Sequence, residues 1–91
     1  MTQPDPVRVA VNGYGVIGKR VASAVLAQTD MRLAGVADIA ADWRLRPLEA
    51  QDIGLFAATP EHVATMREAG LPIAGTLDDL LRQADLVVDC T

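Results

Sequence analysis

Three observations predict an α/β fold in which helices cover both faces of a parallel sheet. Short apolar runs rich in β-branched residues alternate along the chain with segments whose apolar residues recur at helical spacing. A glycine-rich turn joins the first of these runs to the first helical segment. The 91 residues are 51% hydrophobic but only 3% aromatic, so Val, Leu, Ile and Ala must build the core, as is usual for a sheet buried on both sides.

The first forty residues predict a strand, a helix and a second strand. Residues 1–6 are polar and contain two prolines, which favours a flexible N-terminus. Val7–Asn12 and Met31–Asp38 are short apolar runs typical of buried strands. Between them, residues 19–28 carry apolar side chains at helical spacing. This order of elements is a βαβ unit.

The rest of the chain predicts shorter elements, which bring the sheet to roughly four to five strands. Thr59, Pro60 and Glu61 are typical of a helix start, and Gly70 is typical of a helix end. The expected elements are a short helix over 42–51, a weak strand over 53–58, a helix over 59–69, an extended segment over 71–74, a helix over 76–83 and a final buried strand over 86–90.

Gly13, Gly15 and Gly18 form a Gly-x-Gly-x-x-Gly pattern between the first strand and the first helix. Gly13 permits a tight turn, Gly15 lets the backbone approach a pyrophosphate, and Gly18 lets the helix pack closely on the strand. The free N–H groups of Val16, Ile17 and Gly18 then point at the phosphates. A glycine turn kept for packing alone is the alternative, but the flanking strands and helix favour a partial Rossmann fold that binds a dinucleotide.

Asp38 ends the second strand, about twenty residues after Gly18, where a carboxylate accepts hydrogen bonds from the adenosine ribose. A carboxylate there also repels a 2′-phosphate, so we expect NAD to be preferred over NADP. Arg44 and Arg46 follow closely, and pairing of either with a 2′-phosphate keeps NADP possible.

Charge and composition exclude several other classes of partner. The net charge of −4 and the pI of about 4.6 argue against nucleic-acid binding. No apolar run is long enough to span a membrane, and no signal peptide opens the chain. The single cysteine, Cys90, fits a reducing cytoplasm and is expected to be a buried structural thiol. His62 is expected to be a surface residue, and we expect no metal site at Asp78 and Asp79.

The segment from Val9 to Ala22, VAVNGYGVIGKRVA, closely resembles the opening of archaeal-type (type II) glyceraldehyde-3-phosphate dehydrogenases. The resemblance continues in residues 59–63, 69–76 and 85–91 and so covers nearly the whole chain. It implies the N-terminal part of an NAD(P)-binding Rossmann domain. The cofactor contacts that it implies are those of Gly13, Tyr14, Gly15, Val16, Ile17, Gly18 and Thr91.

The family oxidises glyceraldehyde 3-phosphate to 1,3-bisphosphoglycerate, reduces NAD or NADP through a cysteine thioester, and works as a homotetramer. The family's Ser-Cys-Asn-Thr string and catalytic histidine have no match in these 91 residues. We therefore expect residues 7–91 to be the N-terminal half of the dinucleotide-binding domain, with no catalytic residue and no activity alone. Asp38-Ile-Ala-Ala41 also departs from the Thr/Lys segment of members that use NADP.

Two alternatives remain. In the first, the chain is a stand-alone, non-catalytic nucleotide-binding or assembly module. In the second, it belongs to a semialdehyde or homoserine dehydrogenase, and the Asn-Gly-Tyr-Gly string disfavours this second alternative. Because the final strand is expected to leave one sheet edge and some apolar face exposed, we also expect the chain to self-associate as a dimer through that edge or face.

Overall fold

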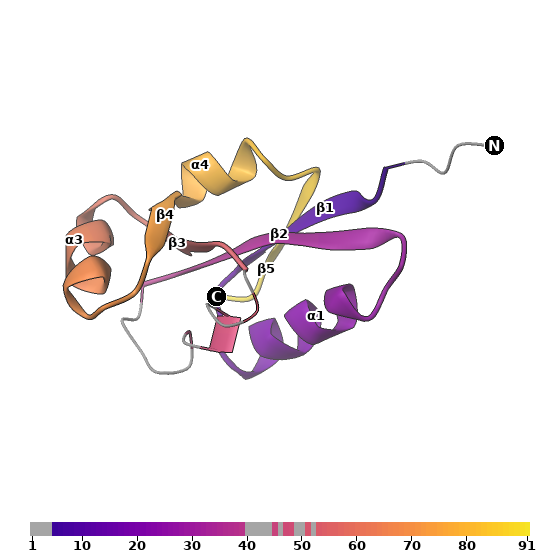
Figure 1. The fold of residues 1–91 in the computed structure, drawn as a ribbon, viewed down its shortest axis with the longest axis horizontal. Helices are drawn as coiled ribbons and strands as arrows, with labels where there is room; N and C mark the ends of the chain where they lie inside the picture. The colour runs from indigo at the N-terminus through magenta and orange to yellow at the C-terminus, as the bar shows by residue number, and fades with distance from the viewer. Residues whose placement is uncertain (1–4, 40–44, 46, 49–50, 52) are drawn as a thin grey trace.

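The computed structural model describes residues 5–39, 45, 47–48, 51 and 53–91. In this part the chain forms a five-stranded parallel sheet (Figure 1), which confirms the predicted fold class. The elements in chain order are β1 (Val7–Asn12), α1 (Val16–Leu26), β2 (Met31–Asp38), β3 (Leu55–Ala57), α3 (Glu61–Glu68), β4 (Ile73–Thr76), α4 (Leu77–Leu81) and β5 (Leu86–Asp89).

The strand order, β4-β3-β2-β1-β5, places β1 between β2 and β5. From β1 the chain steps outward through β2 and β3 to β4. It then returns through α4 to place β5 on the other side of β1, where Val9 pairs with Leu86 and Asn12 with Asp89. The order therefore reverses at β1, and the crevice at the carboxyl ends of β1 and β5 is where open α/β sheets bind their ligands.

Helices cover both faces of the sheet, as predicted. Side chains along a strand alternate between the faces, so β1 contributes Val9 and Val11 to one face and Ala10 to the other. The larger cluster lies under α1 and α3, and its buried members include Val9, Val11, Ala22, Val25, Leu55 and Met66. The smaller cluster lies under α4 and consists of the buried residues Ala10, Ala37, Phe56 and Leu80.

The observed helices differ at their starts from those predicted. α1 begins at Val16 rather than at residue 19, so Gly18 lies inside the helix and not before it. The N-cap of α3 is Pro60 rather than Thr59, and the Thr59 hydroxyl hydrogen-bonds the Nδ1 atom of His62 at 2.6 Å instead of capping the helix.

The predicted cap of α4 holds, although the helix ends at Leu81, two residues early. Its first-turn Asp79 carboxylate accepts hydrogen bonds from the Thr76 N–H at 2.9 Å and the Thr76 hydroxyl at 3.2 Å. These bonds hold the pKa of Asp79 below its ordinary value. β4 covers Ile73–Thr76 rather than 71–74 because Ile73 is the residue that pairs with Leu55 of β3. The helix predicted over 42–51 and the flexible segment predicted over 1–6 lie largely outside the described residues.

β5 is not buried as a whole, contrary to the prediction. Leu86 and Val87 are 45% and 43% exposed, whereas Val88 and Cys90 are half-buried against the larger cluster. Within the described residues β5 pairs with β1 alone, and this leaves its other edge open. Of the helices in that same part of the chain, none has the length and apolar character that a membrane crossing requires.

Candidate functional site

The glycine loop begins where β1 ends, wedged between the ends of two neighbouring strands. The Gly13 N–H donates to the Ala37 carbonyl of β2 at 2.7 Å, and the Cys90 N–H donates to the Asn12 carbonyl at 2.7 Å. Gly13 has a φ of +94°, a conformation that L side chains rarely adopt. A Cβ atom there would lie 3.0–3.1 Å from the peptide that joins Cys90 to Thr91. Glycine is therefore required for this turn.

Gly15 and Gly18 have opposite surroundings. A Cβ atom on Gly18 would lie 1.9 Å from the Gly13 carbonyl oxygen and 3.5 Å from Val11 of β1, so the close contact of α1 is with the loop rather than with the strand. A Cβ atom on Gly15 would meet no heavy atom within 4 Å. The space beside Gly15 is therefore open to a ligand.

The start of α1 faces that open space. Gly15 is the N-cap, and the first helical residues, Val16 and Ile17, are 69% and 60% exposed. The Lys19 N–H donates a hydrogen bond to the carbonyl of the N-cap residue Gly15, at 2.9 Å. The N–H groups of the first turn ahead of it have no partner within the helix. Such a turn, at the positive end of the helix dipole, suits the phosphates of a dinucleotide.

Asp38 lies beside the loop at the carboxyl end of β2, as predicted. Its Oδ2 atom accepts the Tyr14 N–H at 2.7 Å, and its Oδ1 atom accepts the Ile39 N–H at 2.6 Å. The carboxylate therefore bridges the glycine loop and the end of β2. The position suits contact with a ribose, which remains a prediction.

On the other side of β1, Thr91 lies at the carboxyl end of β5 and hydrogen-bonds Asp89. The Asp89 Oδ1 atom accepts the Thr91 hydroxyl at 2.8 Å, the Thr91 N–H at 3.3 Å and the Asn12 side-chain amide at 3.4 Å. These bonds, led by that of the Thr91 hydroxyl, hold the pKa of Asp89 below its ordinary value, so the carboxylate stays ionised. Thr91 is therefore held by Asp89 at the carboxyl end of β5, next to Gly13.

Asn12 and Asp89 were not among the predicted site residues. The Asn12 Oδ1 atom is buried and accepts no hydrogen bond from the residues that the structure describes. Buried acceptors ordinarily have a partner, so this oxygen suits a donor from a bound water or a ligand. The available sequence signals were the place of Asn12 directly before Gly13 and the place of Asp89 at a strand end.

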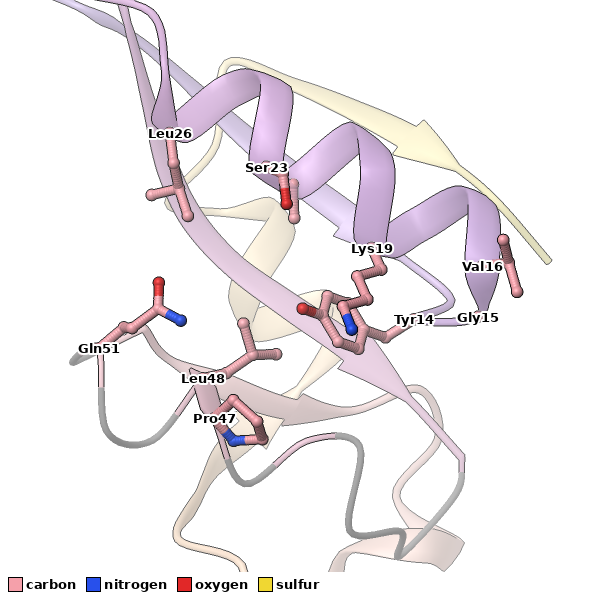
Figure 2. Close-up of a pocket in the computed structure, with 10 residues that line it drawn as sticks. Tyr14, Gly15, Val16, Lys19, Ser23, Leu26, Pro47, Leu48 and Gln51 are labelled. Carbon is pink, nitrogen blue, oxygen red and sulfur yellow. The ribbon is translucent and has the colours of Figure 1, made fainter.

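A cavity of about 290 Å³ opens along α1 next to the glycine loop (Figure 2). The Tyr14 ring and Lys19 line it on the side of the glycine loop, while Pro47, Leu48 and Gln51 face α1 from across the cavity. The remaining lining residues are Gly15, Val16, Ala22, Ser23 and Leu26. Burial raises the pKa of the Tyr14 hydroxyl, so the group stays protonated. The mostly apolar wall suits an apolar part of a ligand whose phosphates lie at the loop.

Of the other residues singled out in the sequence, Cys90 lies beside the loop, where its peptide contacts Gly13. His62 is half-buried at the start of α3, bonded to Thr59, and Cys90 is half-buried rather than fully buried. Arg44 and Arg46 lie outside the described residues. Among those described, no group of three or more His, Cys, Asp or Glu side chains comes together as a metal site would require.

Comparison with known proteins agrees with this geometry. The family model described as "Dihydrodipicolinate reductase, N-terminus" matches residues 7–91. The glyceraldehyde-3-phosphate dehydrogenase of Methanothermobacter thermautotrophicus is 47% identical over 85 residues, and that of Archaeoglobus fulgidus is 49% identical over 85 residues. Each alignment covers 93% of this chain but only 25% of the relative.

The predicted resemblance to archaeal glyceraldehyde-3-phosphate dehydrogenases is thus confirmed, and the chain spans about a quarter of the length of these relatives. A solved structure described as an NAD-binding protein from Listeria innocua has 15% identity and a TM-score of 0.46, over 94% of this chain and 35% of that one. The chain belongs to the family of the dihydrodipicolinate reductase N-terminus, and it is an NAD(P)-binding Rossmann domain homologous to archaeal glyceraldehyde-3-phosphate dehydrogenases.

Proposed function

We propose that this chain is the NAD(P)-binding portion of a phosphorylating glyceraldehyde-3-phosphate dehydrogenase, working in the cytoplasm. In this proposal residues 7–91 form the N-terminal half of the dinucleotide-binding domain, and the catalytic cysteine and histidine belong to a separate part of the enzyme. The observation that carries the proposal is the open space at Gly15, directly before the exposed first turn of α1. The sequence identity to archaeal relatives supports the choice of enzyme.

The loop residues divide the work of binding. Gly13 makes the turn, Gly15 admits the pyrophosphate, and the N–H groups of Val16, Ile17 and Gly18 bind it. Tyr14 contributes its ring to the wall of the adjoining cavity. Asp38 accepts hydrogen bonds from the ribose hydroxyls on one side of β1, and Thr91 borders the cofactor on the other side. The bound nicotinamide supplies the hydride acceptor of the reaction.

NAD is preferred over NADP in this proposal, because the Asp38 carboxylate beside the ribose repels a 2′-phosphate. Calorimetric titration of the chain with NAD, NADP and ADP-ribose tests both the binding and the preference. Since only half of the domain is proposed to lie here, we expect weak affinity for NAD, on the order of 0.1–1 mM. NADP binding as tight as that of NAD would contradict the preference.

Gly15→Ala separates binding from folding. The added Cβ atom meets no neighbour, so the free energy of unfolding should change by less than about 1 kcal/mol. It would, however, stand where the pyrophosphate approaches, and we expect the affinity for NAD to fall at least about tenfold. Gln28→Ala, an exposed position just beyond the other end of α1, is the control. Unchanged affinity in Gly15→Ala would contradict the proposed site.

The chain alone is proposed to be inactive. An assay with glyceraldehyde 3-phosphate, phosphate and NAD should show no NADH formation from the purified chain. Measurable turnover that is lost in Cys90→Ser would contradict the proposal, because it would place the catalytic thiol inside these residues.

We also propose that the chain self-associates as a dimer through the open side of β5. The support is the exposure of Leu86 and Val87 on a strand that pairs with β1 alone among the described residues. Such edges and apolar side chains template pairing with another chain. Light scattering at high concentration should give a dimer, which Val87→Lys should weaken, and a strictly monomeric mass contradicts the proposal. A dimer that binds no NAD would favour the alternative, a non-catalytic assembly module.

A further inference from the structure

The Tyr14 N–H is held by a side chain that is distant in sequence. Its hydrogen bond to the Asp38 Oδ2 atom, at 2.7 Å, joins residues 24 positions apart. Hydrogen bonds to an ionised acceptor are about twice as strong as neutral ones. The same carboxylate is itself fixed, because its Oδ1 atom accepts the Ile39 N–H at 2.6 Å. The contact is therefore a tether between two strand ends rather than a bond between chain neighbours.

The tether acts on the part of the loop that packing holds least. Gly13 is fixed by its hydrogen bond to Ala37 and by its contact with the Cys90 peptide. The Tyr14 ring is buried in the larger cluster, which anchors the side chain but leaves the peptide orientation to hydrogen bonds. Beyond it, a Cβ on Gly15 would touch nothing. The Asp38 carboxylate therefore orients the last tethered peptide before the open phosphate cradle.

We infer that Asp38 is a positioning residue for the phosphate cradle, apart from any contact that it makes with the ribose. By holding the Tyr14 peptide, it aims the N–H groups that follow at the pyrophosphate. This inference rests on the proposed function, and it assigns Asp38 an effect on ligands that contain no ribose.

The two roles predict opposite signs for the same experiment. If Asp38 only contacts the ribose, its removal takes away a negative charge near the cradle, and a bare pyrophosphate binds equally well or more tightly. If Asp38 positions the loop, its removal weakens the binding of bare pyrophosphate despite the lost charge. The probe is therefore inorganic pyrophosphate, followed by NMR shifts of the loop amides.

We expect Asp38→Ala to weaken pyrophosphate binding about 5- to 20-fold relative to the unsubstituted chain. Asp38→Asn should lose less, because its amide oxygen still accepts one of the two N–H groups. Asp30→Ala, which removes an exposed carboxylate before β2, is matched in charge and should not weaken binding. Pyrophosphate binding by Asp38→Ala as tight as by the unsubstituted chain overturns the inference.

Amide hydrogen exchange of the ligand-free chain gives a second, independent readout. The Tyr14 amide should exchange about tenfold or more faster in Asp38→Ala, whereas the Gly13 amide, bonded to Ala37, should keep its protection. Unchanged Tyr14 exchange overturns the inference whatever the ligand does. Failure of the unsubstituted chain to bind pyrophosphate defeats the proposed function instead, so the two failures are distinguishable.

Discussion

At each end of the β1–β5 pair, a residue of β1 is hydrogen-bonded to an aspartate 77 positions further along the chain, yet the two junctions differ. At the amino end, Asp85 accepts the Arg8 backbone N–H at 2.8 Å and two guanidinium bonds at 3.1 and 3.3 Å. At the carboxyl end, Asp89 accepts the side-chain amide of Asn12 at 3.4 Å, and its shortest bond goes to the Thr91 hydroxyl.

The difference teaches how one pair of strands serves two purposes. The amino junction is an ion pair, and all of its hydrogen bonds hold β1 to β5. The carboxyl junction is looser and leaves the Asn12 amide oxygen buried without a partner among the described residues. The end remote from the glycine loop therefore serves only to join the two strands, while the end beside the loop keeps a buried acceptor available for a ligand. Substitutions at the two ends should therefore differ in kind.

The largest effect is expected at the carboxyl end, for Gly18→Ala. Its Cβ atom would lie 1.9 Å from a backbone oxygen, so α1 must move away from the loop. We expect the free energy of unfolding to fall by about 3 kcal/mol, measured by urea denaturation, with loss of NAD binding. Gly15→Ala is the control for an added methyl group. Gly18→Ala with the stability of the unsubstituted chain would refute the close packing.

A smaller effect, of a different kind, is expected at the amino end. Arg8→Met keeps the aliphatic stem but removes the guanidinium bonds to Asp85. The free energy of unfolding should fall by less than in Gly18→Ala, and the loss should shrink at high salt because the pair is half exposed. The affinity for NAD should not change. Altered affinity in calorimetry would show that the two ends are not independent.

The smallest effect is expected on the loss of stability at low pH. The Arg8 side chain holds the pKa of Asp85 below its ordinary value of 3.8. A depressed folded pKa means that the unfolded chain binds more protons in this range, so the contribution of the pair is present above pH 3.8 and is lost as the pH falls through the folded value. Asp85→Asn should therefore lose less stability than the unsubstituted chain between pH 5 and pH 3, by denaturation at each pH. Parallel pH profiles would assign the acid sensitivity to Asp79 or Asp89.

The first βαβ unit was largely predictable because its signals are local. The bounds of β1 and β2 were predicted residue for residue, since each is a short, mostly apolar run. The start of α1 was missed because glycine usually disfavours a helix interior, whereas Gly18 lies inside α1 for the sake of its contact with the Gly13 carbonyl. The start of β4 was missed because it is set by the pairing of Ile73 with Leu55 of β3, which the local sequence does not show.

The candidate site divides in the same way. Gly13, Gly15 and Asp38 could be placed together at one end of the sheet from the sequence, because their spacing carries the pattern; their role in binding stays a prediction. Asn12 and Asp89 were missed because their relation depends on the pairing of β1 with β5. The two residues are 77 positions apart in the sequence, and only the strand order brings them within hydrogen-bond distance.

The position of β1 between an early and a late partner also sets an order of assembly. β2 follows β1 after one helix, whereas β5 follows after every other element of the sheet. Closing the longer loop costs more chain entropy, and pairings distant in sequence form slowly. During synthesis the glycine loop can therefore fold against β2 well before β5 arrives. The last strand to dock is also expected to be the first to open, so a dinucleotide that spans β1 and β5 should slow the unfolding of the sheet as well as bind to it.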